Sequence, residues 1–215
     1  MNWLLEFDRK AFLFLNSKHS PLWDDLMWWA SDKMVWIPIC VILLINIIVK
    51  ELPYRFIFTI LFVAIAVTLS DQISGFLKWF FERPRPTHDS ALLNGHPIKA
   101  LVHTVNNYRG GNYGFVSSHA ANAFCIFTFL ASQFKSIKWG LFLFACALII
   151  SYSRIYLGVH YPLDIICGAI VGILAGTQCY ILKVRVAIYI ERQIVIREEK
   201  RKAKRKAEER KARFS

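Results

Sequence analysis

The sequence predicts an all-α fold: a polytopic membrane bundle of about five transmembrane helices, with interfacial helices before it and a basic helix after it. Hydrophobic residues make up 55% of the 215 residues and aromatic residues 15%, which exceeds the usual content of a soluble protein. The apolar residues also gather into runs of about the length that crosses a bilayer. The sequence has no internal repeat, so we expect one membrane-embedded domain.

Residues 1–33 are expected to form amphipathic helices at the membrane surface. Between Trp3 and Leu15, apolar side chains recur at helical spacing with charged side chains opposite, a pattern typical of a helix lying on a bilayer. Ser20 and Pro21 predict the start of a second helix, because serine is favoured as an N-cap and proline as the first helical residue. Tryptophans in this second segment suit the depth of the lipid headgroups.

Residues 34–182 are predicted to form the transmembrane core. A spanning helix needs about 20 largely apolar residues, which most of the candidate segments supply. The first segment is short, and it becomes long enough if residues 30–33 belong to the same helix. Residues 87–116 form a longer loop, rich in glycine, asparagine and histidine. The candidate spans are residues 34–49, 54–77, 117–133, 137–152 and 162–182.

The positive charge is concentrated in residues 183–215, which are predicted to be a basic cytoplasmic tail. The formal net charge is +12, and from Lys183 onward thirteen Lys and Arg residues face five Glu residues, a balance of +8. The preceding chain therefore carries only +4. A basic helix of this kind suits the anionic inner leaflet. Nucleic-acid binding is the alternative that we do not expect, because the aromatic and glycine residues of such a module are missing.

Three clusters of polar residues border the predicted spans, and the alternation of the spans places all three on one side of the membrane. Cations lie where two helices end, while serine and histidine lie where two helices begin, so the helix dipoles also favour an anion there. His160 and Asp164 are four residues apart, so a carboxylate can orient the imidazole from the same helix face. The clusters read Lys-x6-Arg-Pro from Lys78, Ser-x-His from Ser117, and Ser-Arg-x5-His-x3-Asp from Ser153.

The opposite side of the bundle is expected to be cytoplasmic, because positively charged residues outside the three clusters accumulate there. The side with the three clusters would then face the periplasm or the exterior, as in a protein of the bacterial inner membrane. The cations on the cytoplasmic side are Lys50, Arg55, Lys135, Lys138, Lys183 and those of the tail.

Together the three motifs resemble the signature of the type 2 phosphatidic acid phosphatase family, which shares its core with vanadium haloperoxidases and bacterial acid phosphatases. The resemblance covers residues 78–164 and implies a lipid phosphatase without a metal or other cofactor. It implies that His160 attacks phosphorus to form a phosphohistidine, that Asp164 orients it, and that His119 acts as general acid and base. The implied phosphate-binding residues are Lys78, Arg85, Ser117, Ser118 and Arg154.

The sequence departs from the family pattern in its second motif, where Ser118 stands in the place of a glycine. A serine can still offer its N–H, but it restricts the backbone if a positive φ is needed. Asp71, inside the second span, is expected to pair with Lys78 or another cation of the site. The loop 87–116 is expected to cap the site; a metal site at its histidines is the alternative, although their spacing matches no standard ligand set.

A membrane location predicts a lipid mono- or diphosphate as the substrate. The leading expectation is undecaprenyl diphosphate, because such carriers are recycled on the outer face of the membrane. Lipid A, phosphatidylglycerophosphate and phosphatidate remain alternatives. Two other classes are a catalytically inactive protein that binds lipid phosphate and a vanadium haloperoxidase, whose relatives are soluble. The oligomeric state does not follow from the sequence.

Overall fold

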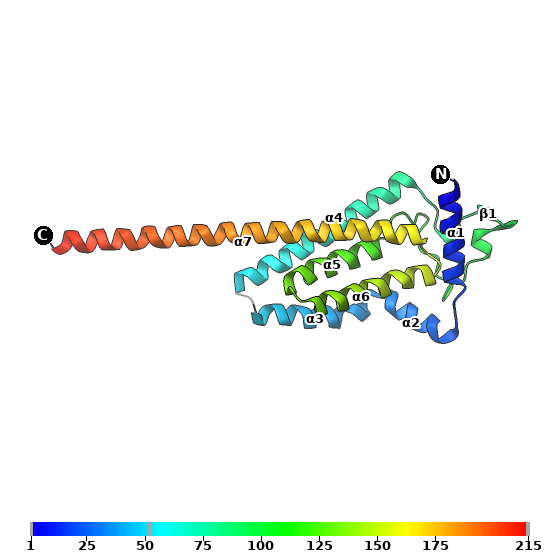
Figure 1. Ribbon diagram of the computed structural model, residues 1–215, viewed down its shortest axis with the longest axis horizontal. Coiled ribbons are helices and arrows are strands. Elements are labelled where there is room, and N and C mark those ends of the chain that lie inside the picture. The colour runs from blue at the N-terminus through cyan, green and yellow to red at the C-terminus, as the bar shows by residue number, and fades with distance from the viewer. Residues whose placement is uncertain (1, 51–52, 214–215) are drawn as a thin grey trace.

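The computed structural model describes residues 2–50 and 53–213, which contain seven α-helices, and it confirms the all-α prediction (Figure 1). Between α4 and α5 lie two 3-10 turns, η1 (Pro86–His88) and η2 (Ile98–Ala100), and a hairpin of β1 (Leu92–Leu93) and β2 (His96–Pro97). The helices are α1 (Asn2–Asn16), α2 (Pro21–Ser31), α3 (Lys33–Lys50), α4 (Pro53–Phe81), α5 (Ser118–Phe134), α6 (Ile137–Tyr156) and α7 (Pro162–Arg213).

Helix α5 lies at the centre of the bundle, packed against α4, α6 and α7. Its side chains explain this place, because small and apolar residues on several of its faces are fully buried. Ala120, Ala121, Cys125 and Phe129 have no exposed surface. Cys125 and Phe129 belong to a core cluster that includes residues of α3, α4, α6 and α7. The start of α5 is therefore held between the ends of its neighbours.

Three glycines of α7 allow this helix to lie directly against α5. Gly168, Gly172 and Gly176 are four residues apart, so they share one helix face. A Cβ atom on Gly168 would lie 2.7 Å from the carbonyl oxygen of Ser117, and the other two glycines also face carbonyl oxygens of α5. Small residues at this spacing are typical of tightly packed membrane helices. The close approach holds the first turn of α7 beside the start of α5.

Three helices of the described chain are long and apolar enough to cross a membrane: Tyr54–Phe81, Ile137–Tyr156 and the first part of Pro162–Lys206. Helices α2 and α3 pass the same test only together, as a pair bent by 56°. Helix α5, expected to be a further span, has 17 residues and runs alongside the others within the bundle (Figure 1). The prediction of an integral membrane bundle is confirmed.

The bend at Asp32 separates α2 from α3, so residues 30–33 do not extend the first span as a single helix. Asp32 has an extended backbone, with φ −80° and ψ 127°, and its Oδ1 accepts a hydrogen bond of 3.0 Å from the N–H of Met34. This side chain satisfies a free N–H at the start of α3, which favours a new helix over a continuous one. Ser20 precedes α2 as expected, but its side chain makes no capping hydrogen bond.

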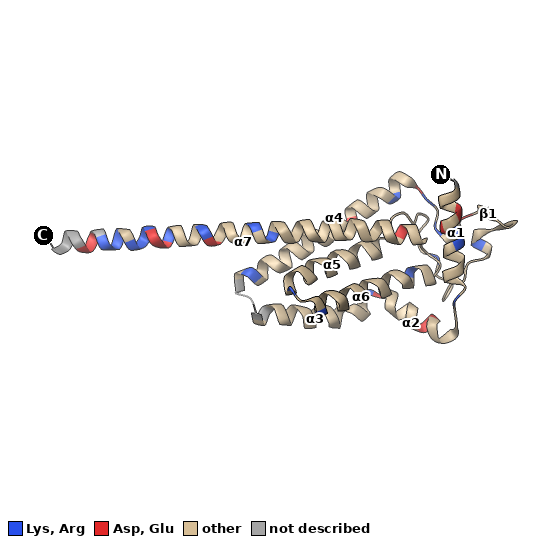
Figure 2. Cartoon of the chain, viewed as in Figure 1, with Lys and Arg blue, Asp and Glu red and all other residues tan. Residues whose placement is uncertain are grey.

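The basic tail continues α7 without a break. Helix α7 has 52 residues and extends well beyond the bundle, with its Lys, Arg and Glu residues along the projecting part (Figures 1 and 2). No glycine or proline follows Gly176, and alternating Lys, Arg and Glu residues are good helix formers. Near the base of the projection, Arg55 of α4 donates to Glu191 at 2.8 Å through Nε.

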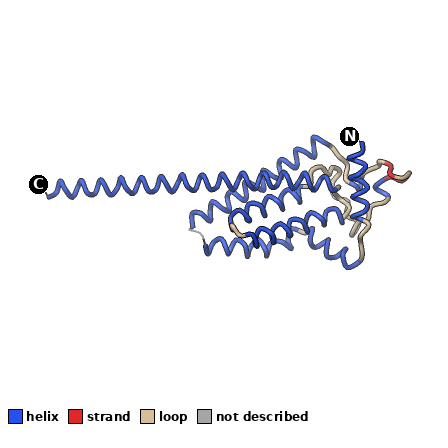
Figure 3. The backbone as a smooth tube through the Cα atoms, in the orientation of Figure 1, coloured by secondary structure: helices blue, strands red, loops and turns tan. Residues whose placement is uncertain are grey.

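The other end of the bundle is covered by α1 and by the irregular segment between α4 and α5 (Figure 3). Helix α1 crosses this end of the bundle (Figure 1). Its inner face buries Phe12 against the ring of Tyr161, with a centroid distance of 5.3 Å, while Trp3, Phe7 and Phe14 are exposed on its outer face. The polar residues of the three motifs lie beneath this cover.

Candidate active site

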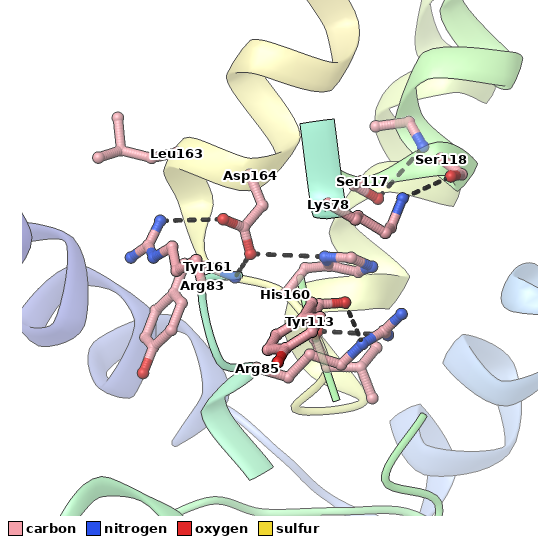
Figure 4. A network of polar contacts seen from close by, with 12 residues as sticks. Lys78, Arg83, Arg85, Tyr113, Ser117, Ser118, His160, Tyr161, Leu163 and Asp164 are labelled. Atoms are coloured by element: carbon pink, nitrogen blue, oxygen red, sulfur yellow. Dashed lines mark hydrogen bonds and ion pairs between the residues drawn. The ribbon is translucent and has the colours of Figure 1, made fainter. Parts of the chain in front are cut away.

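The structure brings the three motifs together at the covered end of the bundle. Lys78 lies in the last turn of α4, Ser117 and Ser118 begin α5, Arg154 lies in the last turn of α6, and Asp164 lies in the first turn of α7. Figure 4 shows Lys78 and the two serines close to His160 and Asp164. Helix ends of both polarities thus surround one site, as the spacing of spans and motifs predicts.

His160 is buried in the short turn between α6 and α7. Gly158 precedes it with φ +76°, a left-handed conformation that lets α6 end sharply and that favours glycine. The Nδ1 atom of His160 lies 3.5 Å from Oδ2 of Asp164, longer than a good hydrogen bond, and has no hydrogen-bond partner among the described residues. Gly114 packs on this pair, because a Cβ there would lie 2.9 Å from the same Oδ2.

Burial, and then the positive charges of Arg85 and Arg154, lower the pKa of His160 well below its ordinary value. The side chain is therefore a neutral imidazole near pH 7. A neutral ring keeps a lone pair on one nitrogen, which a nucleophile or base requires. Because Nδ1 faces Asp164, the nitrogen available for that role is Nε2.

Three cations beside His160 have only neutral hydrogen-bond partners within residues 2–50 and 53–213. The Nζ atom of Lys78 donates to Oγ of Ser118 at 2.6 Å. Arg85 donates to the carbonyl oxygens of Tyr113 and Val159, at 3.1 and 3.5 Å (Figure 4). Burial, and then the charge of Arg154, lower the pKa of Arg85. These contacts leave the positive charges uncompensated.

Arg154 also has neutral hydrogen-bond partners, the hydroxyls of Ser31 and Tyr108. Its Nε is buried without a partner among the described residues. Neither Lys78, Arg85 nor Arg154 forms an ion pair with a described carboxylate. Arg154 is buried and Lys78 and Arg85 are half-buried, and positive charge out of water is costly unless an anion neutralises it, so the cluster suits an anionic ligand.

The serines of the second motif have different partners. Ser117 is fully buried, and its Oγ accepts a hydrogen bond of 3.4 Å from the N–H of Ala120, so it caps α5. Ser118 is not among the described residues with positive φ, so its side chain fits the backbone where the family has glycine. Its hydroxyl instead receives the hydrogen bond from Lys78. Ser153 donates to the carbonyl oxygen of Ile150 at 2.7 Å, inside its own helix.

His119 lines two cavities of about 330 Å³ each. One cavity lies at the end of the bundle and is also lined by Arg154 and Tyr108. The other runs along apolar side chains between the helices. Residues that line this apolar cavity include Trp36, Cys40, Val67, Ile126, Phe127 and Ile150. His119 therefore stands between a cavity that contains Arg154 and one lined mainly by apolar side chains.

Asp71 lines the apolar cavity, and its recorded partner is the amide of Asn122, which donates to Oδ1 at 3.3 Å. The expected pairing with Lys78 is not formed, because the ammonium group of Lys78 bonds Ser118. Helix α4 packs against α5, so that Ser118 of α5 lies next to Lys78 and Asn122 of α5 lies next to Asp71.

Arg83 is a site residue that does not belong to the three sequence motifs. Its Nη1 donates to Oδ1 of Asp164 at 2.9 Å, and its Nη2 donates to Oδ2 of Asp8 at 2.6 Å. The guanidinium also lies 4.3 Å from the ring centroid of Tyr161. The sequence shows only that an arginine stands two residues before Arg85. Nothing in its pattern pairs it with the N-terminal helix.

The comparisons with known proteins agree with this arrangement. The family model described as "PAP2 superfamily" matches residues 57–187, more than half of the chain. A lipid A 4'-phosphatase of Bacteroides thetaiotaomicron is 35% identical over 184 residues, which cover 85% of this chain and 79% of that protein.

Two solved structures share the fold. The crystal structure of Aquifex aeolicus LpxE has a TM-score of 0.57 and 28% identity, over 82% of this chain and 93% of that one. A PAP2 type phosphatidylglycerolphosphate phosphatase from Bacillus subtilis has a TM-score of 0.64 at 17% identity, over 86% of this chain and 89% of that one. The family expected from the three motifs is therefore confirmed: the chain belongs to the PAP2 superfamily and is a membrane lipid phosphatase.

Proposed function

We propose that this protein hydrolyses a phosphate monoester of a lipid A-type phosphoglycolipid and releases inorganic phosphate. The observation that carries the proposal is the group of cations without carboxylate partners, placed around the neutral His160 and next to an apolar cavity. Lipid A is favoured over the other lipids because two lipid A 4'-phosphatases are 35% and 34% identical over 79% and 74% of their own lengths. Undecaprenyl diphosphate, the leading expectation from the sequence, becomes the comparison substrate.

The reaction would proceed in two steps on the phosphoryl group. The Nε2 of His160 attacks phosphorus, an N–P bond forms, and the bond from phosphorus to the sugar oxygen breaks. His119 gives its proton to the departing oxygen. In the second step His119 takes a proton from water, the resulting hydroxide attacks phosphorus, and the N–P bond breaks to release inorganic phosphate and neutral His160.

The surrounding charges would favour the transition state of each step. Negative charge spreads over the phosphoryl oxygens as the bonds exchange, and Lys78, Arg85 and Arg154 supply fixed positive charge to them. The imidazole of His160 becomes positive when the N–P bond forms. Asp164, 3.5 Å from Nδ1, is placed to stabilise that charge and to keep the ring in one orientation.

The apolar cavity supports a lipid as the substrate. It reaches His119 at one end and continues between α3, α4 and α5 at the depth of the spans. An acyl chain can remain among apolar side chains there while the phosphate reaches the cations. We also infer that the site faces the periplasm and that the basic part of α7, at the opposite end, is cytoplasmic and near anionic lipids (Figure 2).

The test is phosphate release by the purified protein from lipid A, undecaprenyl diphosphate, phosphatidylglycerophosphate and phosphatidate. We expect the highest kcat/KM on lipid A, with mass spectrometry showing loss of one phosphate. His160→Ala and His119→Ala should each lower kcat by at least about 10³-fold. A faster reaction with another lipid would overturn the substrate, and equal rates for wild type and His160→Ala would overturn the mechanism.

A further inference from the structure

The Asp164 carboxylate is held from both of its oxygens. Oδ2 accepts the N–H of Tyr161 at 2.9 Å and faces His160, while Oδ1 accepts Nη1 of Arg83 at 2.9 Å (Figure 4). A carboxylate bonded at both oxygens cannot rotate about its Cβ–Cγ bond without breaking a charge-assisted hydrogen bond. Arg83 therefore sets the angle at which Oδ2 meets the imidazole.

Arg83 is in turn held by Asp8 of α1. The Asp8 side chain is 2% exposed, and its Oδ2 accepts Nη2 of Arg83 at 2.6 Å. Burial alone would lower the pKa of Arg83, but the carboxylates of Asp164 and Asp8 outweigh burial and raise it. One permanently charged guanidinium thus joins two buried carboxylates from distant parts of the sequence.

Asp8 also contacts the helix that carries Asp164. Its Oδ1 accepts a hydrogen bond of 2.9 Å from the N–H of Leu163, which is a free donor in the first turn of α7. One carboxylate therefore fixes both the start of α7 and the arginine that orients Asp164. Other polar residues of α1 bond elsewhere: Arg9 pairs with Asp89, and Asn16 bonds the backbone at the end of α6.

We propose that Asp8, on the N-terminal helix, is a positioning residue of the active site, which aims the Asp164 carboxylate at His160 through Arg83. The inference rests on the proposed roles of His160 and Asp164. Asp8 makes no hydrogen bond or ion pair with Lys78 or Arg85, two of the described cations proposed to bind the phosphate. Its loss should therefore slow the chemical step and leave phosphate binding intact.

The experiment measures kcat, KM and inhibition by vanadate for Asp8→Asn, Arg83→Met and the double variant in the full-length protein. Asp8→Asn keeps an acceptor for Leu163 but removes the charge. We expect it to lower kcat by about 10- to 100-fold, the usual cost of losing a group that orients an active-site residue. The KM and the inhibition constant for vanadate should stay within about twofold. In the Arg83→Met background, Asp8→Asn should have no further effect on kcat.

Glu6→Gln is the matched control, because it removes an exposed carboxylate of the same helix, which pairs with the exposed Lys10 at 2.6 Å. It should leave all three constants unchanged. If Asp8→Asn does not fold, Arg83→Lys is the second variant: it keeps the charge but cannot bond both carboxylates as a fork, and it should also lower kcat alone.

Two outcomes would overturn the inference: a wild-type kcat in Asp8→Asn, or the same fold-loss from Asp8→Asn with and without Arg83. The assay uses whichever lipid phosphate the wild type hydrolyses fastest. A wild type that hydrolyses no lipid phosphate would contradict the proposed function instead, so the two failures are distinguishable.

Discussion

The two sides of His160 contain similar cations that are balanced in opposite ways. On one side, Arg83 lies between the carboxylates of Asp8 and Asp164 and bonds both. On the other side, Arg85 and Arg154 bond carbonyl and hydroxyl oxygens. An arginine bonded to two carboxylates has its charge neutralised within the protein, whereas an arginine with neutral partners keeps a charge that an anionic ligand can neutralise, as we propose for Arg85 and Arg154.

The largest expected difference between the two sides is in stability. Arg83→Met leaves two buried carboxylates without their cation, which we expect to cost about 3–5 kcal/mol. For a chain of this length, that loss lowers the unfolding temperature by roughly 6–20 °C. Arg85→Met removes a cation next to Arg154 and should leave the unfolding temperature unchanged or higher. Thermal unfolding in detergent measures both, and equal losses for the two variants would contradict the comparison.

The next effect is on catalysis. Arg85→Met should lower kcat/KM by about 10²- to 10³-fold, the cost of losing one donor to a developing oxyanion. It should also weaken inhibition by vanadate, because vanadate occupies the place of the phosphoryl group. Steady-state assays well below the unfolding temperature test this, with Arg83→Met as the variant that keeps its vanadate affinity. An unchanged inhibition constant in Arg85→Met would remove Arg85 from the phosphate site.

A smaller effect concerns pH. The pKa of His160 is lowered by burial and by the adjacent cations, so the unfolded chain binds a proton at this residue before the folded protein does. Neutral His160 makes its full contribution to the free energy of unfolding above the pKa of the unfolded chain, about 6.5. As the pH falls below that value, the contribution decreases by at most about 1.4 kcal/mol per pH unit. Unfolding temperatures between pH 8 and 5 should fall more steeply for the wild type than for His160→Gln. Parallel curves would show that His160 is not the group responsible.

The smallest effect is expected at the far end of the bundle. Arg55 and Glu191 form an ion pair with Nη2 to Oε1 at 2.5 Å, but both side chains are substantially exposed. Water and salt screen such a pair. Glu191→Gln should therefore change neither the unfolding temperature nor kcat measurably. A clear loss in either assay would mean that the base of the projecting helix matters to the site.

The positions of the spans and of the motif residues beside them could be predicted from the sequence because both are local properties. Hydropathy places the long apolar segments, and a residue at the boundary of a span stays at that end of the bundle however the helices pack. This argument predicts that Lys78, Ser117 and Arg154 share one side. It does not predict the bend at Asp32, where one carboxylate bonds the first turn of a new helix.

The membrane bundle, the family and the set of residues at one end of the helices follow from the amino-acid sequence alone. Which of two neighbouring arginines bonds carboxylates, and which bonds neutral oxygens, depends on how the helices pack. The reason is that Arg83 finds Asp8 only because α1 packs across the end of the bundle, 75 residues away in sequence. Such a pairing depends on the packing of two distant segments, and no spacing within either segment encodes it.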